Sequence, residues 1–332
     1  MRHANLSIFV PHVGCPHLCS FCNQRSISGS YGLPSAQTVE ALGQQSAAQL
    51  RASGVPAEIA FFGGSFTAIG RDYMLELLRA AQPFVQQGIV SGIRISTRPD
   101  YIDPEVLALL AQYHVTAIEL GAQSMSDAVL AANGRGHTAQ DVQRAARLVQ
   151  DGGFELGLQM MTGLFRADAQ SDLETAHQLV QLHPDTVRIY PTVVMTDTLL
   201  ADYYRFGVYR PQPLCQAVED CARLIELFEQ AGIQVIRVGL HAQESLSEGM
   251  LAGPYHPAFR ELCEGAIWAK LLQKAFYGKP QGRYQVSVAP RALSKITGHG
   301  AQPIENLRRM GYTIKIKQDC RLKGRSFRIG EM

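Results

Sequence analysis

Residues 4–22 read ANLSIFVPHVGCPHLCSFC, an apolar run that leads directly into three cysteines. The β-branched and aromatic residues predict a strand over 6–13, and the cysteines that follow have the spacing CxxxCxxC. Positions i, i+4 and i+7 share one face of a helix, but Gly14 and Pro16 disfavour a helix here. We therefore predict a compact loop that turns the thiols of Cys15, Cys19 and Cys22 toward one ligand.

The chain has seven cysteines, an odd number, and no secretory segment accompanies them, which favours a metal or redox role over a disulfide framework. Three thiolates on a four-iron cluster leave one iron without a protein ligand, and a small molecule can chelate that iron. A structural zinc site is the alternative, with His12 or His17 as the fourth ligand. We expect the iron–sulfur cluster.

The composition is that of a packed globular protein, with 46% hydrophobic and 18% charged residues among 332. No run approaches eighteen apolar residues and the apolar stretch before His12 is too short for a signal peptide, so we expect a cytoplasmic protein with no membrane partner. Alternating patterns of period 2 and 3.6 predict a parallel α/β sheet. The expected strands are 6–13, 58–63, 92–97, 117–122, 155–161 and 186–193, and a further helix and strand follow at 214–230 and 234–238.

The net charge of +2 is unevenly distributed along the chain. Twelve Lys or Arg and three acidic residues follow position 278, a net charge of +9, so the preceding part carries −7. The stretch 244–257, interrupted by Gly, Ser and Pro, predicts a linker between a first domain, 1–243, and a basic second domain, 244–332. His241 and His256 are expected to be polar groups of this junction, and Trp268 a core residue.

The second domain shows the order strand, helix, Gly298-His299-Gly300-Ala301, helix, strand. This order resembles the β-α-α-β core of a KH domain, whose GxxG loop clamps a nucleic-acid backbone. Ala301 stands where that loop has its second glycine. The resemblance implies a small α/β domain that binds RNA through this loop, helped by Lys295 and Arg308; a domain that only caps the first one, with a solvated basic surface, is the alternative.

The first domain resembles the radical S-adenosylmethionine (SAM) superfamily, in the branch of the Elongator catalytic subunit and oxygen-independent coproporphyrinogen oxidase. The resemblance covers roughly residues 4–240 and begins with the cysteine loop, in which Phe21 precedes the last cysteine. It implies a partial (β/α)6 barrel in which SAM chelates the open iron of a [4Fe-4S] cluster. The residues expected at SAM lie at the strand ends and in the cysteine loop: Phe21, Gly63, Gly64, Ser65, Ser96, Arg98, Gln123 and Arg135.

Two of these positions depart from the family pattern. Ser96 stands where the Elongator branch has glutamate, and Gln159 stands where relatives carry Asp or His, so Gln159 can form hydrogen bonds but cannot titrate. Gln159 and Tyr190 are expected to face the substrate, and no residue is assigned a catalytic proton transfer.

The resemblance implies an oxygen-sensitive enzyme in which flavodoxin or ferredoxin reduces the cluster and SAM is cleaved to a 5′-deoxyadenosyl radical. With the basic second domain it favours tRNA base modification, without an Elongator-type acetyltransferase domain. Two alternatives stay open: a small-molecule enzyme similar to porphyrinogen oxidase, and a non-catalytic RNA-binding protein stabilised by zinc.

Overall fold

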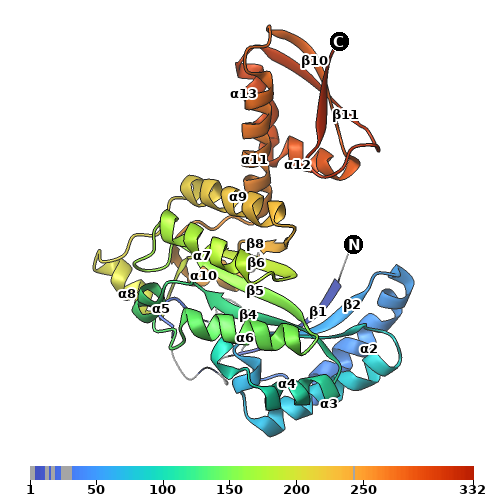
Figure 1. Ribbon diagram of the computed structural model, residues 1–332, viewed down its shortest axis with the longest axis vertical. Helices are drawn as coiled ribbons and strands as arrows, with labels where there is room; N and C mark the ends of the chain where they lie inside the picture. The colour runs from blue at the N-terminus through green and yellow to red at the C-terminus, as the bar shows by residue number, and fades with distance from the viewer. Residues whose placement is uncertain (1–3, 12–14, 16–18, 24–31, 242–243) are drawn as a thin grey trace.

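A computed structural model describes residues 4–11, 15, 19–23, 32–241 and 244–332, without the side chains of 244, 245 and 247. Its centre is a curled, wholly parallel sheet (Figure 1). The strands follow the order β1 (Ala4–Val10), β2 (Ala57–Gly63), β3 (Gly92–Thr97), β4 (Val115–Gln123), β5 (Glu155–Thr162), β6 (Thr186–Pro191) and β8 (Gln234–Val238). The predicted α/β half-barrel is confirmed, and the strand at 234–238 joins it as a seventh member.

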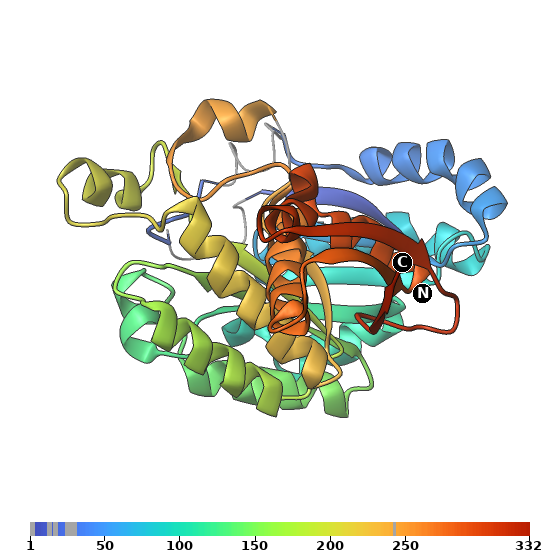
Figure 2. The same ribbon diagram turned by 90° about the horizontal axis from the view of Figure 1, so that it is seen from above.

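Six long helices cover the outer face of this sheet, as Figures 1 and 2 show. They are α2 (Ala36–Ser53), α3 (Arg71–Gln86), α4 (Pro104–Gln112), α6 (Ala139–Asp151), α7 (Ala169–Gln181) and α9 (Leu214–Gln230). Ser35, Thr138 and Asp168 each form a capping box at the start of a helix, so local side chains satisfy the first backbone N–H groups. None of the described helices combines the length and apolar composition needed to cross a bilayer.

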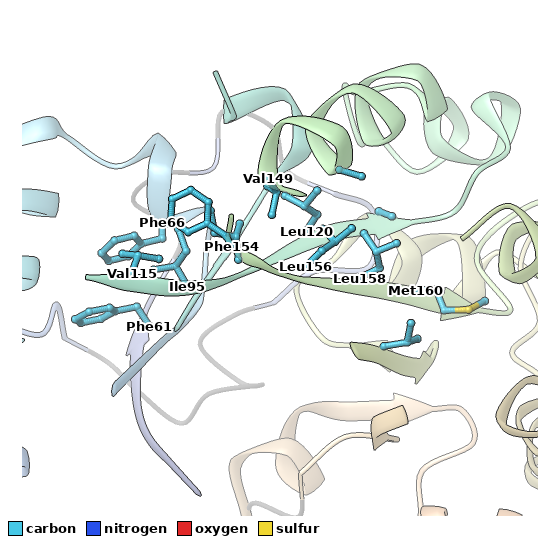
Figure 3. Packing of buried hydrophobic residues seen from close by; sticks show 14 of the residues in the cluster. Phe61, Phe66, Ile95, Val115, Leu120, Val149, Phe154, Leu156, Leu158 and Met160 are labelled. Carbon is cyan, nitrogen blue, oxygen red and sulfur yellow. The ribbon is translucent and has the colours of Figure 1, made fainter. Parts of the chain in front are cut away.

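The main core lies between the sheet and these helices (Figure 3). Phe61 of β2 stacks on Phe66 with ring centroids 4.8 Å apart. Leu120 and Leu156, on neighbouring strands, are fully buried beside Val149 of α6. Burying such side chains stabilises the fold by about 2 kcal/mol each, so this core holds the strands in place.

The segment predicted as a linker is partly regular, which corrects that expectation. It contains α10 (Glu244–Gly249) and β9 (Met250–Ala252), and β9 pairs with β7 (Val194–Met195), which follows β6. Leu246 is buried with Val193 and Met195. Apolar residues within the Gly- and Ser-rich stretch thus hold it against the barrel.

The chain then forms α11 (Phe259–Phe276) and a three-stranded sheet of order β11-β10-β12 (Figure 1). The strands are β10 (Gly282–Val288), β11 (Tyr312–Gln318) and β12 (Phe327–Glu331), and α12 (Leu293–Thr297) and α13 (Gln302–Arg309) lie between β10 and β11. Trp268, fully buried as predicted, packs here with Phe276 and Tyr284. The structure therefore contains the predicted order of strand, two helices and strand, and adds β12.

Ion pairs attach this C-terminal sheet domain to the barrel. Glu264 of α11 is buried and accepts from Lys295 Nζ at 2.7 Å and from Arg325 Nη2 at 2.8 Å. Arg325 also pairs with Glu229 of α9. Since α11 contacts both the barrel and the small sheet, the division at 243/244 stays a prediction.

Candidate active site

A cavity of about 230 Å³ opens where the carboxyl ends of the barrel strands meet. Thirteen residues that the sequence assigned to the cluster, SAM or substrate line it together: Cys15, Cys19, Phe21, Cys22, Gly63, Gly64, Ser65, Ser96, Arg98, Gln123, Arg135, Gln159 and Tyr190. They come from the cysteine loop, from the carboxyl ends of five strands and the residues just after them, and, for Arg135, from the segment between α5 (Asp127–Ala132) and α6. The remaining candidates, Lys295, Gly298, His299, Gly300 and Arg308, belong to the C-terminal sheet domain.

Backbone and side-chain contacts hold the described part of the cysteine loop. Ser20 Oγ donates to Asn133 Oδ1 at 2.7 Å, and Leu200 N donates to the Ser20 carbonyl at 2.7 Å. Phe21 is buried in an apolar cluster with Leu164 and Leu200, which anchors the loop. His12 and His17, the candidate zinc ligands, lie outside the described residues.

The thiols lie at one wall of the cavity, and burial raises the pKa of Cys15. Within the described ranges no three Cys, His, Asp or Glu side chains already form a metal site. The ligand set of three thiols suits iron–sulfur chemistry.

The ends of β2 and β3 are joined at the cavity by hydroxyl groups. Gly63 has φ = 110°, a conformation that favours glycine. Ser65 Oγ lies 2.9 Å from Thr97 Oγ1 and accepts from Arg98 N at 3.2 Å. The guanidinium of Arg98 donates to both carboxylate oxygens of Asp100, at 2.9 and 2.7 Å, so much of its hydrogen-bonding capacity is already used.

Gln123 and Arg135 line the cavity and carry buried polar atoms without partners among the described residues, and these atoms test whether SAM fits. Arg135 Nη2 donates to the Gly121 carbonyl at 2.7 Å and Nη1 to Cys19 Sγ at 3.2 Å. Among the described residues, nothing hydrogen-bonds Arg135 Nε or Gln123 Oε1, although both atoms are buried. A buried donor and acceptor without partners are costly unless a polar ligand satisfies them, which fits a ligand with a carboxylate and hydroxyls.

His137 lies behind these two residues and was missed by the sequence analysis. Its Nε2 is 3.2 Å from the Ala122 carbonyl, so Nε2 carries the proton in this contact. Burial and the charge of Arg135 lower the pKa of His137 to about 4. A neutral imidazole therefore supports the end of β4, where Gln123 adopts φ = 64°.

A buried ion-pair network includes Arg188, which lines the cavity, and the sequence analysis missed this too. Glu119 is 1% exposed and accepts from Arg188 Nε at 2.6 Å, Arg188 Nη2 at 2.8 Å and Gln159 Nε2 at 2.8 Å. Arg94 Nη1 lies 3.5 Å from Glu119 and Arg94 Nε donates to Glu58 at 2.7 Å. Charged residues in the middle of apolar strands, at positions 58, 94, 119 and 188, are the sequence signal that points to such a network.

Gln159 and Ser96 line the cavity beside this network. Gln159 Nε2 donates to Ser96 Oγ at 3.2 Å as well as to Glu119, so the two departures from the family pattern contact one another. Burial raises the pKa of Tyr190, which keeps its phenol protonated. His241 also lines the cavity, which corrects its assignment to a linker.

Comparison with known families identifies the class of this site. The model described as the Radical SAM superfamily matches residues 9–179, just over half of the chain, and the Radical_SAM C-terminal domain model matches residues 184–268. The chain therefore belongs to the radical SAM superfamily and is an enzyme. The family implies a [4Fe-4S] cluster and SAM.

Individual relatives confirm the resemblance to the Elongator subunit. Human Elongator complex protein 3 is 29% identical over 190 residues, which cover 51% of this chain and 35% of that protein. The tRNA uridine(34) acetyltransferase of Methanocaldococcus jannaschii is 30% identical over 128 residues, or 38% of this chain and 24% of that one. The chain thus matches only about a third or less of these relatives' length.

A solved structure shares the fold. The archaeal Methanocaldococcus infernus Elp3 with an N-terminal deletion superimposes with a TM-score of 0.64 at 20% identity, covering 81% of this chain and 63% of that one. The shared fold extends beyond the segment matched in sequence.

Proposed function

We propose that this radical SAM enzyme modifies a base of tRNA. The observation that carries the proposal is the contact of the loop Gly298-His299-Gly300-Ala301 with His256, which lines a small pocket that adjoins the cavity. His299 packs edge to face on His256 with ring centroids 5.0 Å apart. His256 and Leu240 line a small pocket, and Leu240 also lines the cavity.

The backbone of this loop supports a nucleic-acid role. Gly298, Gly300 and Ala301 have φ values of 61°, 62° and 55°, a left-handed conformation that costs a residue with a Cβ about 1 kcal/mol. Ala301 thus adopts a backbone conformation that glycine adopts at lower cost. A loop of this kind can approach a phosphate backbone closely.

The relatives favour RNA as the substrate. The Methanocaldococcus jannaschii relative carries the name tRNA uridine(34) acetyltransferase, and the net charge of +9 after position 278 suits a polyanion. Two of the predicted RNA contacts have internal partners instead: Lys295 pairs with Glu264 and Arg308 with Glu305. We therefore propose that the loop Gly298–Ala301, rather than Lys295 or Arg308, contacts the phosphates.

Different residues of the cavity are proposed to hold the cluster and SAM. Cys15, Cys19 and Cys22 would hold three irons of the cluster, and Gln123 and Arg135 would hold the polar end of SAM. When bound, the cluster and SAM would supply radical chemistry that removes a hydrogen atom from the substrate. The reducing electron comes from a flavodoxin or ferredoxin.

The cavity walls control access and position. Phe9, Phe62 and Met161 make much of the lining apolar, which limits water near a reactive species. The amide of Gln159 does not titrate, and its hydrogen bonds to Glu119 and Ser96 fix its position. Gln159 and the protonated Tyr190 are thus suited to orient a substrate base by hydrogen bonds.

The test is nucleoside mass spectrometry of tRNA from a strain that lacks the gene, beside its parent. We expect one modified nucleoside to be missing, to return with the wild-type gene, and to stay missing with Cys19→Ala. An unchanged nucleoside profile would contradict tRNA modification and favour a small-molecule substrate of the porphyrinogen oxidase kind.

A further inference from the structure

The C-terminal sheet has one covered face and one open face. Tyr284, Val286 and Val288 of β10 are at most 4% exposed and pack against α11, α12 and α13. Because side chains alternate along a strand, the residues between them point away from the helices. Four basic residues occupy this outer face and are exposed: Arg283, Lys315, Lys317 and Arg328. We call these four residues the basic face.

The strand register places these charges in rows across the sheet. Ser287 pairs with Lys317 on one side and with Arg328 on the other. Gln285 pairs with Lys315 in the adjacent row. Neighbouring strands lie about 4.8 Å apart and alternate residues about 7 Å apart, so Lys315, Lys317 and Arg328 form a compact group.

Nothing within the described chain neutralises this group by a direct ion pair. Lys295, Arg308, Arg321 and Arg325 of the same domain each have a carboxylate partner within 4 Å. None of the four residues of the basic face has one in the described structure. The other outward positions of the rows, Gln285, Ser287, Thr313 and Gly330, are uncharged.

The polar character of the rows favours RNA over a lipid surface. Binding to a membrane interface requires apolar side chains that enter the acyl boundary, and the outward positions of these strands carry none. Amide and hydroxyl groups between the cations can bond phosphate and sugar oxygens. Lysines on edge strands also prevent edge pairing, but Arg283 lies on the central strand β10, where no edge needs protection.

The basic face is also close along the chain to the loop Gly298–Ala301. The row of Lys317 and Arg328 lies at the end of β10, and from there the chain enters α12 and then the loop Gly298–Ala301. Arg325, in the turn between β11 and β12, fixes the same end of the sheet to Glu229 and Glu264. These ion pairs attach the small sheet to the barrel.

We infer that the basic face binds the phosphate backbone of tRNA away from the base that enters the barrel. The inference rests on the proposed function and deepens it, because it assigns the electrostatic part of tRNA binding to the open sheet face. The loop Gly298–Ala301 then positions the RNA strand near the cavity, while the basic face supplies affinity that does not depend on the RNA sequence.

The experiment measures binding of an unmodified tRNA transcript to the full chain between 50 and 200 mM KCl. The variant K315Q/K317Q/R328Q removes three charges at exposed strand positions. The matched control R51Q/R79Q/R147Q removes three exposed arginines from the barrel helices α2, α3 and α6. We expect the slope of log affinity against log salt to fall in magnitude by about 2 to 3 in the first variant only. Its loss of affinity over this salt range would then be about 16- to 64-fold smaller than that of the wild type.

Two results would overturn the inference. One is an unchanged salt slope in K315Q/K317Q/R328Q, and the other is a loss of binding to phosphatidylserine vesicles with tRNA binding intact. Release of 5′-deoxyadenosine from SAM without RNA should be equal in all three proteins, which shows that the barrel is intact. Deletion of the gene could leave the tRNA nucleosides unchanged while the salt slope falls only in K315Q/K317Q/R328Q. That outcome would contradict tRNA modification but support RNA binding by the basic face.

Discussion

Glu119→Gln tests how much the barrel depends on its buried ion pairs. The carboxylate of Glu119 is 1% exposed and accepts two hydrogen bonds from Arg188, at 2.6 and 2.8 Å. The substitution keeps the volume but removes the charge, leaving a buried guanidinium without a counter-ion. Breaking a buried pair in this way costs about 3 to 5 kcal/mol. We expect that loss in the free energy of unfolding, measured by urea denaturation followed by circular dichroism.

Glu105→Gln is the matched control. Its partner is Arg71, and the two side chains are 81% and 45% exposed, so solvent screening limits the effect to about 1 kcal/mol or less. The double variant E119Q/R188M should recover most of the lost stability, because an apolar residue replaces the unpaired cation. The reasoning is refuted if Glu119→Gln is no more destabilising than Glu105→Gln.

Three further predictions concern the backbone, pH and the SAM site. Ala301→Gly should leave the free energy of unfolding unchanged or raise it by up to about 1 kcal/mol, because φ is 55° there. The control Ala48→Gly, at an exposed site in α2, should lower the free energy of unfolding by about 1 kcal/mol. An equal loss of stability in both variants would contradict backbone strain at Ala301. The pKa of His137 is lowered to about 4 in the fold and is near 6.5 unfolded, so acidification from pH 7 to 5 should cost the wild type about 2 kcal/mol more than His137→Gln; equal pH dependence in urea unfolding would contradict it. Arg135→Gln should weaken SAM binding in equilibrium dialysis by tenfold or more at unchanged iron content, and unaltered binding would remove Arg135 from the SAM site.

The position of the site was predictable from local sequence because parallel strands share one edge. The cysteine loop follows β1, Gly63 ends β2, and Gln123 ends β4, so the order of strands alone brings them together. Arg135 reaches the same cavity from beyond α5 (Asp127–Ala132) because its guanidinium bonds the Gly121 carbonyl. That contact depends on tertiary structure, and only the family resemblance pointed to it.

The buried charges could not be placed from sequence in the same way. Glu119 and Arg188 lie on strands that are not adjacent, since β5 separates them, and no periodic pattern identifies such partners. The predicted linker was wrong for a related reason: β9 is three residues long and exists because β7 pairs with it. Short elements stabilised by distant partners leave little signal in their own residues.

The most direct test of the central claim uses protein purified without air, with Cys19→Ala beside it. We predict about four irons and four sulfides for each wild-type chain, and release of 5′-deoxyadenosine from SAM after reduction with dithionite. Cys19→Ala should lose both. A wild-type protein that binds one zinc ion, takes up no iron and releases no 5′-deoxyadenosine would contradict the assignment of the three cysteines.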